Sequence, residues 1–149
     1  MRRSRMPVSA EELFRWHAAP GSFSRLTPPW EPVEVVGEEA ALAVGQEVEL
    51  KVRLGPLSLP WIARIVEVIP DRSFTDRQVK GPFAAWQHTH RMEPDGPTAS
   101  YLEDRVTYAL PGWAPGRWIA GGLVRRRLAR LFDYRHRVTA EALAGDPLA

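Results

Sequence analysis

The stretch Trp118–Leu143 reads WIAGGLVRRRLARLFDYRHRVTAEAL, and its apolar residues recur with the period of an α-helix. They fall on one broad face: Leu123, Val124, Leu128, Leu131, Phe132, Val138 and Leu143. Most of the arginines lie off this face, as on an amphipathic helix. A helix of about 26 residues is about 39 Å long. The stretch therefore predicts a helix that crosses a whole domain.

The segments before this helix predict strands. In 47–54, Val48, Leu50, Val52 and Leu54 alternate with charged residues, which is typical of an antiparallel strand with one buried face. We expect further strands near residues 33–35, 61–69, 73–80, 84–94 and 98–110. Ahead of them, Ser9 and Glu12 form a capping box for a helix that ends at Pro20-Gly21, and a short turn follows at 23–26.

These elements predict a single α+β domain over residues 1–149. A sheet of six or seven antiparallel strands cannot bury its apolar face alone, and the last helix is the only element long enough to cover it. We therefore expect a curved sheet that wraps the C-terminal helix, with two short helices near the N-terminus. A pocket for an apolar small molecule is expected between the sheet and the long helix.

The composition excludes several classes of protein. With 44% hydrophobic and 26% charged residues, the chain is ordinary for a folded domain. It has no cysteine, and hence no disulfide or thiolate metal site. We expect a cytoplasmic protein with no membrane insertion, because no apolar run approaches about 20 residues and the basic N-terminus leads into no apolar stretch. The scarcity of thermolabile residues suggests a thermophilic source, although a GC-rich genome produces the same bias.

A net charge of +2 does not predict nucleic-acid binding. The arginines at 125–127, 130 and 137 are interpreted as the solvated side of the last helix. Arg135 lies close to the apolar face instead, where we expect it to pair with a buried carboxylate.

The strand at 84–94 carries the most information about a site. Side chains alternate between the two faces of a strand, and the bulky set should point inward: Trp86, His88, His90 and Met92. If each flanking hairpin has a three-residue loop, Asp76 lies opposite His88 and His88 lies opposite Asp104. This inward polar row has two interpretations, a satisfied patch within the core or the polar end of a pocket.

We expect the same register to place His90 between Phe74 and Leu102. The side chains predicted to line the pocket are Trp61, Phe74, Trp86, His88, His90, Met92, Leu102, Asp104, Tyr108, Trp113, Leu128 and Phe132. Trp113 lies in a loop rich in proline and glycine, which could form the lip of the pocket.

A metal site is an alternative for the two histidines, because His-x-His with a carboxylate can ligate zinc or iron. The other histidines, His17 and His136, lie on predicted helices and offer no third ligand at a convincing spacing. We therefore predict no metal and no cofactor.

Several motifs resemble one family in order and spacing. They are Trp16-His17, Pro20-Gly21-Ser-Phe23, Arg25-Leu26-Thr-Pro28-Pro29-Trp30-Glu31, Phe74-Thr-Asp76-Arg-Gln78, Gly81-Pro82-Phe83, Trp86-Gln-His88-Thr-His90, Asp104-Arg-Val-Thr-Tyr108-Ala-Leu110-Pro111 and Phe132-Asp-Tyr-Arg135-His136. Together they are similar to the SRPBCC, or START-like, superfamily, in the branch labelled polyketide cyclase/dehydrase or ligand-binding SRPBCC.

The resemblance implies the helix-grip fold, in which a seven-stranded sheet grips a C-terminal helix over a deep cavity. It also implies a lipid, polyketide, quinone or other apolar ligand. A similar domain occurs ahead of sugar-nucleotide-epimerase-like domains. This chain has no dinucleotide-binding glycine motif, so we expect an epimerase-like partner to be a separate protein.

We expect binding without turnover. The alternative is a cyclase or dehydrase that assists an aldol-type cyclisation or a dehydration. In that case His88 or His90 would move the proton and Asp76 or Asp104 would orient the imidazole. Tyr108 would then steady an enolate oxygen.

Overall fold

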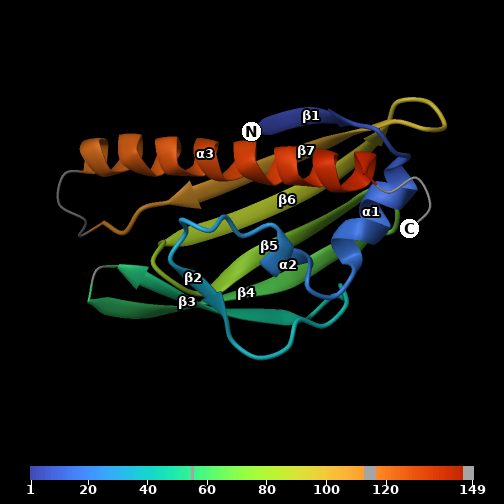
Figure 1. Cartoon of the computed structure of the whole chain (residues 1–149). Coiled ribbons are helices and arrows are strands. Elements are labelled where there is room, and N and C mark those ends of the chain that lie inside the picture. Colours follow the sequence, from blue (N-terminus) through green and yellow to red (C-terminus); the bar gives the residue numbers. More distant parts are fainter. Residues whose placement is uncertain (55, 113–116, 146–149) are drawn as a thin grey trace.

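The computed structural model describes residues 1–54, 56–112 and 117–145, where seven strands form one antiparallel sheet. The strands lie in the order β1-β7-β6-β5-β4-β3-β2. Their bounds are β1 Arg2–Met6, β2 Val33–Val35, β3 Glu47–Leu54, β4 Leu57–Ile69, β5 Ser73–Lys80, β6 Ala85–Pro94 and β7 Ser100–Ala109. Figure 1 shows the long helix α3 (Arg117–Ala144) running along this sheet. The predicted helix-grip arrangement is confirmed.

The two short N-terminal helices are also present. Helix α1 (Ala10–Ala18) begins as the capping box predicts, since the Ser9 hydroxyl accepts a hydrogen bond from the Glu12 amide at 3.2 Å. Helix α2 (Ser22–Arg25) follows Gly21, whose φ of +77° favours glycine. No helix in the described residues is long and apolar enough to cross a membrane.

The N-terminal strand β1 was not expected from the sequence. It pairs with β7 at one edge of the sheet, and its residues Arg2, Arg3 and Arg5 are exposed. Only the buried side chain of Met6 reaches the core. A charged strand with so little alternation gives a weak signal, yet charge is a common feature of edge strands because it discourages pairing with other chains.

The predicted pairing of β5 with β6 is correct, and the predicted pairing of β6 with β7 is wrong by two residues. Asp76 lies opposite His88, as expected. Pro94 pairs with Ser100, so the loop comprises residues 95–99 and is closed by a hydrogen bond from the Asp95 amide to the Ala99 carbonyl at 2.9 Å. His90 therefore lies opposite Asp104, and His88 lies opposite Val106.

A shift of two residues leaves every side chain on its expected face, because the side-chain period of a strand is two. Asp104 still points inward beside the histidines of β6. His90 remains opposite Phe74 on β5, but Leu102 lies opposite Met92 instead of His90.

Helix α3 presents a narrower apolar face than the sequence predicted. Leu123 is 69% exposed, whereas Val124 faces the sheet side of the helix. Successive helical residues are about 100° apart, and this rotation places Leu123 outside the inward arc and Val124 within it. The inward stripe continues at the spacing of a helix through Leu128, Leu131 and Phe132.

Candidate functional site

A cavity of about 390 Å³ lies between the curved sheet and α3. Its volume falls in the range of small-molecule pockets. Most of its wall is apolar and comes from the inner faces of β3 to β6 and from the buried stripe of α3. Apolar lining residues include Val48, Leu50, Val52, Trp61, Ala63, Ile65, Phe74, Phe83, Trp86, Val124, Leu128, Leu131 and Phe132.

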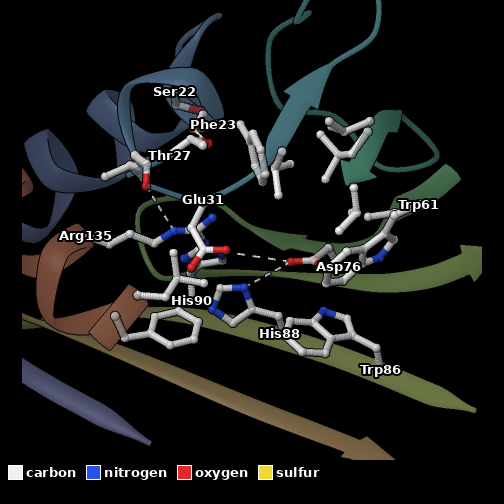
Figure 2. A pocket seen from close by; sticks show the side chains of 18 of the residues that line it. Ser22, Phe23, Thr27, Glu31, Trp61, Asp76, Trp86, His88, His90 and Arg135 are labelled. Atoms are coloured by element: carbon white, nitrogen blue, oxygen red, sulfur yellow. Dashed lines mark hydrogen bonds and ion pairs between the residues drawn. The ribbon is translucent and has the colours of Figure 1, made fainter. Parts of the chain in front are cut away.

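One wall of the cavity is polar. Asp76 from β5 points toward His88 and His90 from β6, as Figure 2 shows. The Asp76 Oδ2 atom lies 3.4 Å from His88 Nδ1 and 3.9 Å from His90 Nε2. The two imidazoles are neighbours on one strand face, with ring centroids 3.9 Å apart. Cross-strand pairing of β5 with β6 therefore assembles this wall.

Asp104 lies behind the two histidines, away from the cavity, and is 3% exposed. His88 Nε2 lies 2.9 Å from Asp104 Oδ1, and His136 Nε2 from α3 lies 2.7 Å from Asp104 Oδ2. His90 Nδ1 also lies 2.8 Å from Asp104 Oδ1, although this nitrogen is not aligned for a hydrogen bond. One buried carboxylate thus forms hydrogen bonds with two imidazoles and lies beside a third.

The carboxylates control the protonation of His88. Burial opposes its positive charge, but hydrogen bonds and attraction to Asp104 and Asp76 prevail and raise the pKa of His88 to about 9. Burial also opposes the negative charge of Asp104. The neighbouring His90, His136 and His88 outweigh that effect and hold the pKa of the Asp104 carboxyl well below its usual range.

The other two cavity histidines are shifted the opposite way. Burial, together with the charge of His88, lowers the pKa of His90. Burial and repulsion from His90 lower the pKa of His17 to about 4. At neutral pH the site therefore combines a charged His88 with neutral imidazoles at His90 and His17.

Arg135 adds a cation to the cavity wall. Its Nε atom donates to the Leu26 carbonyl at 3.2 Å, and its guanidinium packs over the rings of Phe23 and Phe132. Burial lowers its pKa, and attraction to Asp104, among other carboxylates, opposes this shift. Among the described residues it forms no ion pair, so the expected direct pairing with a buried carboxylate is wrong.

The structure brings together seven of the twelve side chains predicted to line the pocket: Trp61, Phe74, Trp86, His88, His90, Leu128 and Phe132. Met92 and Leu102 pack in the core against Met6 and Leu13 instead. Asp104 lies behind the histidines, as described above. Tyr108 packs against Phe83 and Trp86 and does not line the cavity. Trp113 lies outside the described residues.

Two members of the cluster, His17 and His136, were missed as site residues. All four histidines of the chain are buried. His136 lies four residues after the inward-facing Phe132, and His17 lies four residues after the buried Leu13. Helical spacing places each on the buried face of its helix. That spacing is a signal of burial, but it does not show that either histidine lies beside the His-x-His strand.

Comparison with known proteins assigns the chain to a family. Residues 6–133 match the family described as polyketide cyclase/dehydrase and lipid transport. The chain belongs to that polyketide cyclase/dehydrase and lipid transport family. The predicted membership of the SRPBCC superfamily is thereby confirmed.

Solved structures of related fold include proteins of different sizes. A nucleoside-diphosphate sugar epimerase from Corynebacterium glutamicum is 26% identical to this chain, with a TM-score of 0.69. The matched region spans 95% of this chain but only 28% of the epimerase. The Zhui aromatase/cyclase from Streptomyces sp. R1128 is 15% identical, with a TM-score of 0.76 and coverage of 99% and 94% of the two chains.

Norcoclaurine synthase from Thalictrum flavum, solved with dopamine and hydroxybenzaldehyde, is 16% identical with a TM-score of 0.66. The matched region spans 94% of this chain and 84% of the norcoclaurine synthase. At these identities the last two similarities concern the fold alone. No curated protein matches the sequence of this family member.

Proposed function

We propose that the cavity binds an apolar small molecule that carries a polar group at one end. The cavity itself supports this proposal most directly, because its wall is mostly apolar and is polar where Asp76, His88 and His90 meet. A few placed polar groups in an apolar pocket orient a ligand and provide specificity. Membership of a family described by lipid transport and polyketide chemistry supports this proposal.

The polar wall favours an oxygen-bearing group. The Arg135 guanidinium faces the cavity with donors beyond the Nε–H that Leu26 uses. Asp76 is a carboxylate acceptor on the same wall. A hydroxyl, a carbonyl or a carboxylate on a polyketide, quinone or fatty acid would satisfy these groups, while its apolar body fills the remaining volume.

The proposal is tested with a substitution that reduces the cavity volume and leaves the polar wall unchanged. Val48→Phe places a ring into the cavity, whereas Val79→Phe on the exposed face of β5 is the matched control. Anilinonaphthalene sulfonate, an apolar dye with an anionic end, is the probe. We expect Val48→Phe to weaken dye binding at least about tenfold, as about 1.4 kcal/mol of lost binding free energy requires, and Val79→Phe to leave it unchanged. Equal binding by both variants would exclude the cavity as the binding site.

Native mass spectrometry of the purified protein supplies the identity of the ligand. A co-purifying molecule that is present in the wild type and Val79→Phe, and absent from Val48→Phe, would be the natural occupant or one of its analogues.

A second function, acid–base catalysis in the same cavity, is favoured by His90. Its Nε2 atom faces Asp76 on the cavity wall, and burial keeps the imidazole neutral at physiological pH, as a general base requires. Since Tyr108 lies away from the cavity, Arg135 would take its expected role of stabilising an enolate oxygen. Catalysed deuterium exchange at the methyl group of acetylnaphthalene, lost in His90→Gln, would support this function. Exchange no faster than in buffer would rule it out.

A further inference from the structure

Three donor atoms on the polar wall converge on one point. One ligand atom from each of His88, His90 and Asp76 lies within 4.8 Å of the other two. A tetrahedral ion with ligands at about 2.0–2.1 Å holds them about 3.4 Å apart. The distance between Asp76 Oδ2 and His88 Nδ1 is 3.4 Å, and that between Asp76 Oδ2 and His90 Nε2 is 3.9 Å. A shift of about half an ångström by the partly exposed Asp76 closes the longer gap.

Asp104 lies on the opposite side of both imidazoles. His88 Nε2 lies 2.9 Å from its Oδ1 atom and His90 Nδ1 lies 2.8 Å from the same oxygen. Metal-ligating histidines almost always direct their second nitrogen to a carboxylate or carbonyl, as His88 does here, and this fixes the tautomer. When the ion displaces the second proton of His88, one proton remains on each ring, on the nitrogen that faces Asp104. The lone pairs of His88 Nδ1 and His90 Nε2 are then directed toward Asp76.

Asp104 is itself fixed in place. Its second oxygen lies 2.7 Å from His136 Nε2, and the carboxylate is fully enclosed between β7 and α3. A rigid acceptor behind two ligands is what an ordered metal site needs. The charges also balance once His88 has released that proton, because the carboxylates of Asp76 and Asp104 together neutralise a divalent cation between neutral imidazoles.

We propose that His88, His90 and Asp76 form a binding site for a divalent transition metal ion of the zinc and ferrous iron class. Two histidines and one carboxylate on one side of an ion leave the remaining positions open. Here those positions face the cavity, since all three side chains line it. The ion would meet the polar group of any molecule bound there, but its binding needs only the three side chains and does not depend on an apolar ligand.

This arrangement could not be inferred from the His-x-His motif alone. The third ligand comes from the neighbouring strand β5, and the carboxylate behind the imidazoles comes from β7. Cross-strand pairing places Asp76 opposite His88 and Asp104 opposite His90. The pattern of two ligating rings with a shared buried acceptor appears only when β5, β6 and β7 lie side by side.

The test uses untagged protein stripped with a chelator and titrated with zinc. We expect one zinc per chain by calorimetry and elemental analysis. Asp76→Ala and His90→Gln should each weaken binding at least about 100-fold, while Asp133→Asn, a carboxylate exposed on α3, should leave it unchanged. Circular dichroism of each variant checks that the fold is kept. Cobalt supplies an independent readout, because its visible absorption reports imidazole ligands in a site of low coordination number.

Asp104 is a positioning residue in this proposal. Asp104→Asn should weaken zinc binding about 10- to 100-fold and shift the cobalt spectrum. Absence of stoichiometric zinc binding by the wild type, or equal binding by Asp76→Ala and Asp133→Asn, would overturn the proposal. Val48→Phe should retain zinc while it loses the apolar dye, so failure of the metal site and failure of the cavity as a ligand site are distinguishable.

Discussion

Replacing His17 by leucine should remove a defined part of the pH dependence of stability. His17 lies on α1 and is 4% exposed, with Nδ1 2.9 Å from the Leu13 carbonyl oxygen. Its ring centroid is 6.0 Å from that of His90. Burial and repulsion from His90 lower its pKa to about 4, while the Leu13 carbonyl and Asp104 oppose this shift. The folded protein therefore keeps His17 neutral where the unfolded chain protonates it.

The size of the effect follows from the two pKa values. An unfolded histidine titrates near 6.5, so below that pH the unfolded chain binds a proton that the folded protein does not bind until about pH 4. Each pH unit in this interval costs about 1.4 kcal/mol of unfolding free energy. Stability is thus fully present above pH 6.5 and decreases by about 3 kcal/mol as the pH falls to 4. Below about pH 4 the contribution of His17 is constant.

The assay is urea unfolding of the metal-free wild type and His17→Leu at pH 4, 5, 6 and 7, followed by tryptophan fluorescence. The difference in unfolding free energy between the two proteins cancels the titration of most other groups, and we expect it to change by about 3 kcal/mol in favour of the variant from pH 7 to pH 4. Leu13→Ala, which truncates a buried neighbour on the same helix, is the control and should give a difference that does not vary with pH. A pH-independent difference for His17→Leu would refute the reasoning.

Three further predictions concern the stability of the fold. Leu102 is 1% exposed in the core beside Met92, so Leu102→Ala should lower the unfolding free energy by about 3 kcal/mol, and a loss below about 1 kcal/mol in urea unfolding would contradict its core role. Gly96 has a φ of +84° in the loop between β6 and β7, so Gly96→Ala should lower the unfolding free energy by about 1 kcal/mol. An unchanged thermal midpoint would show that the loop tolerates a side chain at this position. Arg53 pairs with Glu34 on the solvent-exposed face, so Arg53→Ala should change the unfolding free energy by less than about 0.5 kcal/mol. A larger loss that disappears at high salt would show that this ion pair contributes more to stability than expected.

The sequence alone predicted which side chains of β6 point inward and how β6 pairs with β5. Alternation of side chains placed Trp86, His88 and His90 on one face, and this depends only on the period of a strand. The turn at residues 81–83 is short, so the position of Asp76 opposite His88 followed from counting residues. The covering helix was equally accessible, because no other segment is long enough to bury the sheet.

Other features depended on contacts between segments far apart in the chain. The loop at residues 95–99 sets the pairing of β6 with β7, and its length is fixed by a hydrogen bond that residue counting does not show. The side chains of His17 and His136 reach the cluster from two helices at opposite ends of the sequence. Helical periodicity places each on a buried face, but not against a particular neighbour. Asp104 meets His88 and His90 on the neighbouring strand β6, but it meets His136 only where α3 closes over the sheet. The energy of a buried carboxylate depends on every group that surrounds it.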